Sequence, residues 1–176
     1  MFDSDLYQVK QKGLTLGKKY TVEESGRKIL ESREKEPDLK RGFVLYSDED
    51  EPVLELTGDQ HLDAPTSFTL LSRDKEIIGG FQRHWSFLSH DWHIIGPDNN
   101  IVGIVEQKNN FMGLMRRFVF EFLPFRFRMT SQEGEKLGRI TGRFSVRDNY
   151  TVELKDGLDP RLAVAAAVLI DIEEKF

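Results

Sequence analysis

Residues 159–171 read Asp-Pro-Arg-Leu-Ala-Val-Ala-Ala-Ala-Val-Leu-Ile-Asp, and this stretch decides the fold. Asp159 followed by Pro160 is typical of a helix start, because aspartate caps the first backbone amides and proline fits the first helical position. All nine residues of 162–170 are apolar, so this helix has no polar face and must be enclosed by protein or lipid. Nine residues rise only about 14 Å, far short of the roughly 30 Å hydrocarbon core of a bilayer. The stretch therefore predicts a helix over about residues 159–175 that the rest of the chain encloses.

Small residues make this helix thin enough to thread through a barrel. Four of its residues are alanines, at positions 163, 165, 166 and 167, and its polar residues stand at its ends. This placement argues against a peripheral amphipathic helix. The residues to which we assign structural roles are Asp159, Pro160, Leu162, Val164, Val168, Leu169 and Asp171.

Ahead of the helix, a unit of strand, polar turn and strand recurs along the chain. The units start at aromatic residues, which are Tyr20, Phe43, Phe68, Trp92, Phe127 and Tyr150. Gly, Asn, Asp and Pro at the bends predict successive antiparallel hairpins. So many strands are expected to close into a barrel, because closure removes exposed edges, and the interior of such a barrel needs a filler. We therefore predict a mainly β fold, an antiparallel barrel of successive hairpins enclosing the C-terminal helix.

The chain of 176 residues is long enough for one such domain, which we expect over residues 18–176. Residues 1–17 are predicted to be either an N-terminal extension or a first edge strand. The absence of cysteine excludes disulfides, thiolate metal sites and a cysteine nucleophile. The acidic start lacks the features of a signal peptide, and there is no 18-residue apolar stretch, so a cytoplasmic protein without a transmembrane span is expected.

The inventory of reactive residues contains no recognised catalytic motif. It lacks a nucleophile elbow, a phosphate-binding glycine loop, a His-Glu-x-x-His zinc motif and a dinucleotide fingerprint. We expect no enzymatic activity and no cofactor. A carboxylate pair assembled across the barrel is the catalytic arrangement that this inventory leaves open.

Charge is unevenly distributed along the chain. The net charge is −5, yet residues 111–147 contain eight basic and three acidic residues. A local cationic patch of this kind could bind the phosphate groups of a lipid surface or a nucleic acid. The alternative is that these arginines are solvated strand residues that face an acidic neighbour.

The most basic part of this segment is also rich in phenylalanine. The preferred interpretation is two barrel strands whose phenylalanines pack on the central helix, with Phe125, Phe127 and Met129 on one face of a strand. The functional interpretation places a loop tip in a membrane interface, through Phe111, Met112, Leu114 and Met115. The candidates for contact with anionic lipid headgroups are Arg116, Arg117, Arg126 and Arg128. Stacking of single-stranded nucleic acid on these aromatics is disfavoured by the overall acidity.

Three histidines, His84, His90 and His93, lie near Asp91 and two tryptophans. A zinc site needs ligands on one face, and positions 90 and 93 of a strand fall on opposite faces. We therefore prefer a hairpin connection over residues 83–92, with aromatic side chains packed beneath it.

The last 29 residues resemble a known family. The acidic and aromatic strand Asp148-Asn149-Tyr150-Thr151-Val152-Glu153-Leu154, the loop from Asp156 to Asp159, and a helix ending in Leu169-Ile170-Asp171 are similar to the C-terminus of LURP-one-related proteins and phospholipid scramblases. These families share the tubby C-terminal-like fold, and the repeat pattern extends the likeness over residues 18–176. The resemblance implies about twelve strands around the helix and a non-catalytic module that binds phospholipid or membrane surfaces, peripheral at the membrane. The alternative is a soluble scaffold or protein-interaction domain without lipid affinity, whose basic segment meets an acidic protein partner.

Several departures limit what the resemblance carries over. The proline-rich segment and palmitoylated cysteines of scramblases are missing. The candidate ligands for a calcium site before the helix are Asp148, Asp156 and Asp159. Such a site is disfavoured because the ligand spacing of an EF-hand is absent. The preferred interpretation is a turn at Asp156 and a helix cap at Asp159. Phosphoinositide-binding residues of tubby proteins have no alignable counterpart here, so none is transferred.

Overall fold

The computed structural model describes residues 1–12, 19–32, 42–58, 67–85, 90–107, 125–143 and 149–173. The strands in this part of the chain are β1 (Leu6–Lys12), β2 (Lys19–Glu24), β3 (Arg27–Ser32), β4 (Phe43–Tyr46), β5 (Pro52–Gly58), β6 (Ser67–Ser72), β7 (Ile77–Trp85), β8 (His90–Ile95), β9 (Ile101–Gln107), β10 (Phe125–Thr130), β11 (Lys136–Arg143) and β12 (Asn149–Leu154). The described helix is α2 (Pro160–Glu173). The predicted mainly β fold with a C-terminal helix is confirmed.

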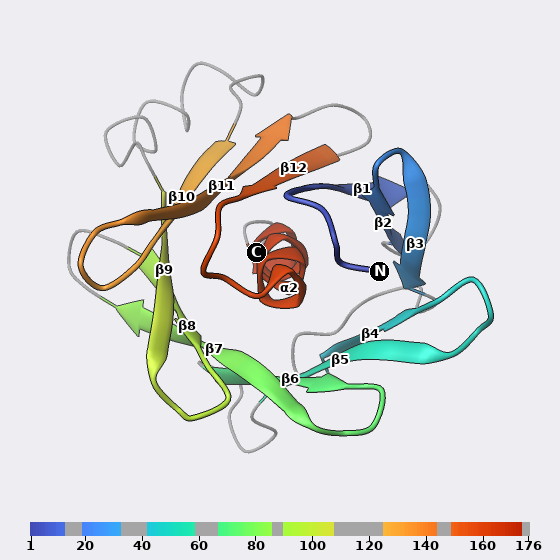
Figure 1. The fold of residues 1–176 in the computed structure, drawn as a ribbon, viewed down its shortest axis with the longest axis horizontal. Coiled ribbons are helices and arrows are strands. Elements are labelled where there is room, and N and C mark those ends of the chain that lie inside the picture. The colour runs from blue at the N-terminus through green and yellow to red at the C-terminus, as the bar shows by residue number, and fades with distance from the viewer. Residues whose placement is uncertain are drawn as a thin grey trace.

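The strands form one closed antiparallel barrel. Each strand pairs with its neighbours in the chain, and β1 pairs with β12 to complete the circle (Figure 1). Residues 6–12, for which an extension and an edge strand were both considered, form β1 and pair with β2 on one side and β12 on the other. Because the sheet is closed, this strand has both its neighbours and is no edge.

Four hairpin turns share one backbone pattern, at one end of the barrel. In the β6–β7 turn, the Ser72 amide donates to the Glu76 carbonyl at 2.8 Å, and the Lys75 amide donates to the Ser72 carbonyl at 3.0 Å. Each of these turns contains one residue in the left-handed conformation. In chain order these residues are Asp50, Lys75, Asn99 and Gly134. A tight turn followed by one left-handed residue is a common three-residue hairpin connection. Its recurrence accounts for the regular spacing of hairpins in the sequence.

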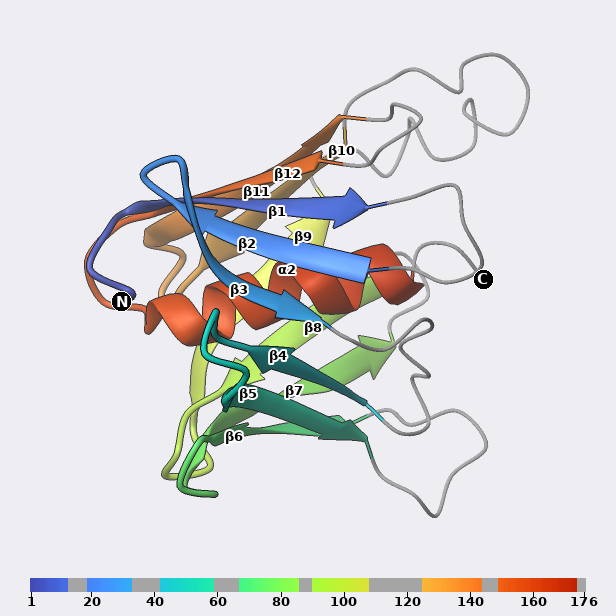
Figure 2. The same cartoon turned by 90° about the vertical axis from the view of Figure 1, so that its right-hand side faces the viewer.

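Helix α2 runs through the middle of the barrel (Figures 1 and 2). At its start, the Asp159 carboxylate accepts a hydrogen bond from the Arg161 amide at 2.9 Å and from the Arg161 guanidinium at 2.6 Å. Every residue from Leu162 to Ile172 is buried. The strands therefore enclose the helix on all sides, as its uninterrupted apolar run requires.

One carboxylate lies among these apolar residues inside the barrel. Asp171 of α2 is fully buried, and it accepts hydrogen bonds from the hydroxyls of Tyr20 on β2 and Tyr150 on β12, the latter at 2.6 Å. A buried carboxylate requires such donors, because water cannot reach it. These bonds join the end of the helix to two separate strands and so set its position in the lumen.

Candidate functional site

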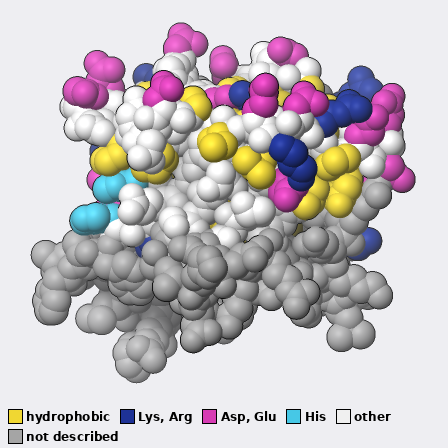
Figure 3. All heavy atoms as spheres, turned by 90° about the horizontal axis from the view of Figure 1, so that it is seen from below, with side chains coloured by type: hydrophobic (Ala, Val, Ile, Leu, Met, Phe, Trp, Pro, Cys, Tyr) yellow, Lys and Arg dark blue, Asp and Glu magenta, His cyan; other side chains and the backbone are white. Residues whose placement is uncertain are grey.

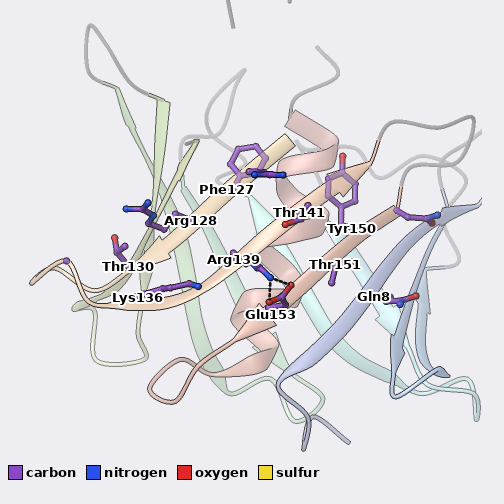
Figure 4. A pocket seen from close by; sticks show the side chains of 13 residues that line it. Gln8, Phe127, Arg128, Thr130, Lys136, Arg139, Thr141, Tyr150, Thr151 and Glu153 are labelled. Carbon is purple, nitrogen blue, oxygen red and sulfur yellow. Dashed lines mark hydrogen bonds and ion pairs between the residues drawn. The ribbon is translucent and has the colours of Figure 1, made fainter. Parts of the chain in front are cut away.

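A groove of about 790 Å³ lies on the outer face of the wall formed by β10, β11, β12 and β1 (Figure 4). We call it the basic groove. Its charged lining side chains in the described part of the chain are Arg126, Arg128, Lys136, Arg139 and Glu153. Its neutral polar lining side chains are Gln8, Thr130, Thr141, Asn149 and Thr151. Four cations therefore share this surface with one carboxylate.

Alternation along β10 places two of these cations outside. Phe127 and Met129 are buried against the interior, whereas Arg126 and Arg128 are exposed. This confirms the predicted division of the strand into an aromatic inner face and an arginine outer face. The side chain of Phe125 lies outside the described set.

Strand register brings like charges together. Arg128 on β10 lies directly opposite Arg139 on β11. Arg139 in turn lies opposite Glu153 on β12, and its guanidinium is 2.7 Å from the Glu153 carboxylate. Like charges directly opposite one another destabilise a sheet by a modest amount, and a carboxylate on the far side of each arginine, Glu106 or Glu153, offsets part of this repulsion.

Arg126 and Arg128 form no ion pair with any described residue. Glu106 on β9 lies opposite Arg128 on its other side, a cross-strand position at which opposite charges attract, although the two side chains form no ion pair. Within the described part of the chain, the wall therefore presents two guanidinium groups without an ion-pair partner, beside a third that is paired with a carboxylate. Such groups are ready donors for an anion, because guanidinium matches carboxylate and phosphate geometry.

The neutral polar residues extend the groove toward β1. Thr141 on β11 faces Arg126 on one side and Thr151 on the other, and Thr151 faces Gln8. Their hydroxyl and amide groups can donate and accept hydrogen bonds. The basic groove can thus bind a ligand that combines an anionic group with hydroxyl groups.

Sequence comparison identifies the family to which this barrel belongs. The sequence model of the LURP-one-related family matches residues 5–171. The chain belongs to the LURP-one-related family. This family is part of the tubby-like C-terminal superfamily, so the resemblance noticed in the sequence is confirmed.

A solved structure has the same fold. An X-ray structure of a protein from Arabidopsis thaliana matches with a TM-score of 0.54 and 11% sequence identity, covering 97% of this chain and 91% of that chain. At this identity the likeness supports the fold alone. No curated protein sequence matches this LURP-one-related chain.

The basic groove of this LURP-one-related protein overlaps only in part with the predicted headgroup site. Arg126 and Arg128 lie in it, whereas Arg116 and Arg117 fall outside the described residues. The membrane-contact candidates also lie outside them: Phe111, Met112, Leu114 and Met115. Lys136 and Arg139 belong to the basic segment but were not predicted as site residues. Their position beside the arginines of β10 depends on the register between β10 and β11, which the sequence does not indicate.

Two of the three calcium candidates, Asp156 and Asp159, fall within the described residues. Asp156 is exposed in the turn before α2, Asp159 is bonded to Arg161, and Asp148 is not among the described residues. Within the described ranges, no group of three His, Cys, Asp or Glu side chains is placed to hold a metal ion. Nor does any helix there have the length and apolar content to cross a membrane.

The histidines lie on another part of the wall, in strands that continue farther than predicted. Residues 77–85 and 90–95 are strands, so the connection between them is narrower than the expected 83–92. His84 and His93 stack with ring centroids 5.0 Å apart, and Arg83 lies over the Trp92 ring at 5.5 Å. Burial and the charge of His84 lower the pKa of His93, while Asp91 opposes the shift. The side chain of His90 is not among those described.

Proposed function

We propose that this LURP-one-related barrel is a non-catalytic module that binds anionic phospholipid surfaces through the basic groove, peripherally at the cytoplasmic face of a membrane. The observation that carries the proposal is the pair of neighbouring arginines, Arg126 and Arg128, which form no ion pair with a described residue, in a groove whose charged lining is otherwise cationic except for Glu153. Members of LURP-one-related and tubby-like families are generally non-catalytic, which agrees with the lack of catalytic motifs.

The distribution of charge around the barrel supports one orientation. Asp and Glu side chains gather along the rim formed by the hairpin turns, with some Lys and Arg side chains among them, at the top of Figure 3. Exposed acidic residues of these turns include Glu49, Asp74, Asp98 and Glu133. An anionic surface repels this rim, so the protein would approach a membrane with the β10–β11 wall and keep the rim away.

Two further sets of residues belong to the proposal as sequence predictions. Arg116 and Arg117 would add headgroup contacts close in sequence to β10. Phe111, Met112, Leu114 and Met115 would insert apolar side chains into the interface, since bulky apolar side chains at a basic surface strengthen peripheral binding.

Cosedimentation with vesicles tests the proposal. The purified protein is mixed with neutral or anionic liposomes at low and physiological salt, with and without calcium. We expect pelleting with anionic vesicles only, weakened by salt because screening reduces attraction between exposed charges. The double variant Arg126→Glu, Arg128→Glu should lose about tenfold or more in partitioning, since each cation near an anionic surface contributes about 1 kcal/mol.

A matched control distinguishes binding at the basic groove from attraction by the overall net charge. Arg27→Glu with Lys155→Glu changes the net charge equally, at exposed residues that do not line the groove. Equal loss in both double variants would assign binding to overall charge rather than to the groove. Absence of pelleting under every condition would reject lipid binding and favour the alternative, a scaffold whose basic groove meets an acidic protein.

A further inference from the structure

We propose that the basic groove selects lipids with a phosphate monoester headgroup over lipids with a phosphodiester alone, and that Glu153 sets this selectivity by competing for Arg139. The inference rests on the proposed function and adds the class of headgroup and the residue that discriminates it.

The first step concerns the exchangeability of the Arg139–Glu153 pair. The Arg139 guanidinium donates to Glu153 at 2.7 Å, and the two side chains are 53% and 40% exposed. Exposed ion pairs are weak, because water solvates both partners well. Glu153 can therefore be displaced from Arg139, but only by a group that attracts the arginine more strongly than a carboxylate does.

The second step is the position of Arg128. Its Cα is paired with that of Arg139, and side chains at such directly opposed positions start about 5 Å apart. A phosphate group between the two guanidinium groups can accept hydrogen bonds from both, because arginine binds phosphate through two parallel donors. The phosphate would also remove the repulsion between the two arginines. Figure 4 shows Arg139 reaching to Glu153, with Arg128 on the neighbouring strand.

The third step is the charge of the ligand. A phosphodiester carries one negative charge, whereas a phosphate monoester carries about −1.5 to −2 at neutral pH. A diester has charge enough to bind Arg126 or Arg128 but gains little by displacing an equally charged carboxylate from Arg139. A monoester can neutralise Arg128 and Arg139 together. A diester therefore leaves Arg139 bonded to Glu153, whereas a monoester displaces Glu153 from Arg139.

The experiment compares vesicles of phosphatidylcholine containing either phosphatidic acid, a monoester, or phosphatidylglycerol, a diester. Mole fractions are adjusted until the two vesicle types have the same surface potential, which removes non-specific attraction as a cause of preference. We expect about fivefold stronger partitioning to the monoester vesicles, as charge-assisted bonds to a second arginine imply. In Glu153→Gln, binding to diester vesicles should rise and the ratio should fall toward one.

Glu106→Gln is the matched control. This substitution removes one exposed negative charge opposite Arg128 but leaves the Arg139–Glu153 pair intact. It should raise binding to both vesicle types alike and preserve their ratio. Thermal unfolding of all three proteins verifies that the variants fold.

The outcomes separate the two proposals. Binding to both vesicle types without preference, or a preference that survives in Glu153→Gln, overturns the monoester assignment and leaves the proposed function in place. Absence of binding to either vesicle overturns the proposed function and the inference with it. Calorimetric titration with soluble glycerol 3-phosphate then identifies the source. If glycerol 3-phosphate binds and Glu153→Gln changes its binding in the same way, the ligand is a free phosphorylated molecule. If it does not bind, the ligand is the lipid.

Discussion

Two carboxylates, one in the barrel lumen and one on its outer wall, illustrate how burial changes what a hydrogen bond contributes to stability. Asp171 is fully buried and bonded to the hydroxyls of Tyr20 and Tyr150. Glu153 is 40% exposed and bonded to Arg139. Both accept hydrogen bonds, but losing a donor in the interior leaves a group that water cannot reach, whereas the groups on the wall are resolvated.

The difference teaches where this protein tolerates change. The lumen holds one packed arrangement, in which a helix and two strands meet at a single carboxylate. The wall holds exposed charged residues, and pairs such as Arg139 with Glu153 add little to stability because water solvates both partners. A surface that is free of stability constraints in this way can be specialised for a ligand.

The largest expected effect comes from Asp171→Asn. The amide replaces one of the two acceptor oxygens with an NH2 donor, so it cannot accept from both tyrosine hydroxyls in a site closed to water. We expect a loss of about 2–4 kcal/mol in the free energy of unfolding, measured by urea denaturation. Glu153→Gln serves as the control and should change stability by less than about 0.5 kcal/mol. Equal losses in the two variants would contradict the division between lumen and wall.

A smaller effect is expected when the donors are removed instead. Tyr20→Phe and Tyr150→Phe each delete one hydroxyl and leave the ring in place, and each should cost about 1–2 kcal/mol. Because both hydroxyls bond the same carboxylate, the double variant should depart from the sum of the single losses. Strict additivity in a double-mutant cycle would show that the two bonds act independently and that Asp171 does not couple β2 to β12.

The smallest effect concerns pH and the histidine pair on the wall. Burial, with the charge of His84, lowers the pKa of His93 below its ordinary value of 6.5. The unfolded chain then binds more protons than the folded one, so this contribution is fully present above pH 6.5 and is lost as pH falls through the folded pKa. Thermal unfolding between pH 7.5 and 5.5 should show a decline in midpoint that is shallower in His93→Gln. Parallel declines in the two proteins would mean that His93 contributes nothing to the pH dependence.

Much of the fold could be predicted because its signals are local. The apolar run at 162–170 is too short to span a bilayer and therefore had to be enclosed by protein, and turn residues indicated the hairpins β2–β3, β4–β5, β6–β7, β8–β9 and β10–β11. The aromatic and arginine faces of β10 followed from alternation alone. By contrast, the strands around the histidines extended farther than the turn signals suggested, since pairing with neighbours lengthened them.

The basic groove was predicted only in part. Arg126 and Arg128 were candidates because they stand in one short basic and aromatic run. Lys136 and Arg139 were missed, since the sequence contains no signal for the register that sets Arg139 opposite Arg128. The same holds for Gln8, which reaches the groove only because β1 pairs with β12 at the closure of the barrel.

Local sequence signals were enough to predict most of the buried positions and several of the turns, because hydrophobic periodicity and turn chemistry act over a few residues. They thereby predicted a barrel of hairpins around a central helix. Only the tertiary structure decided which side chains from distant strands face one another. Cross-strand register places Glu153 on Arg139 and aims Tyr20 and Tyr150 at Asp171, and register depends on the packing of the whole barrel.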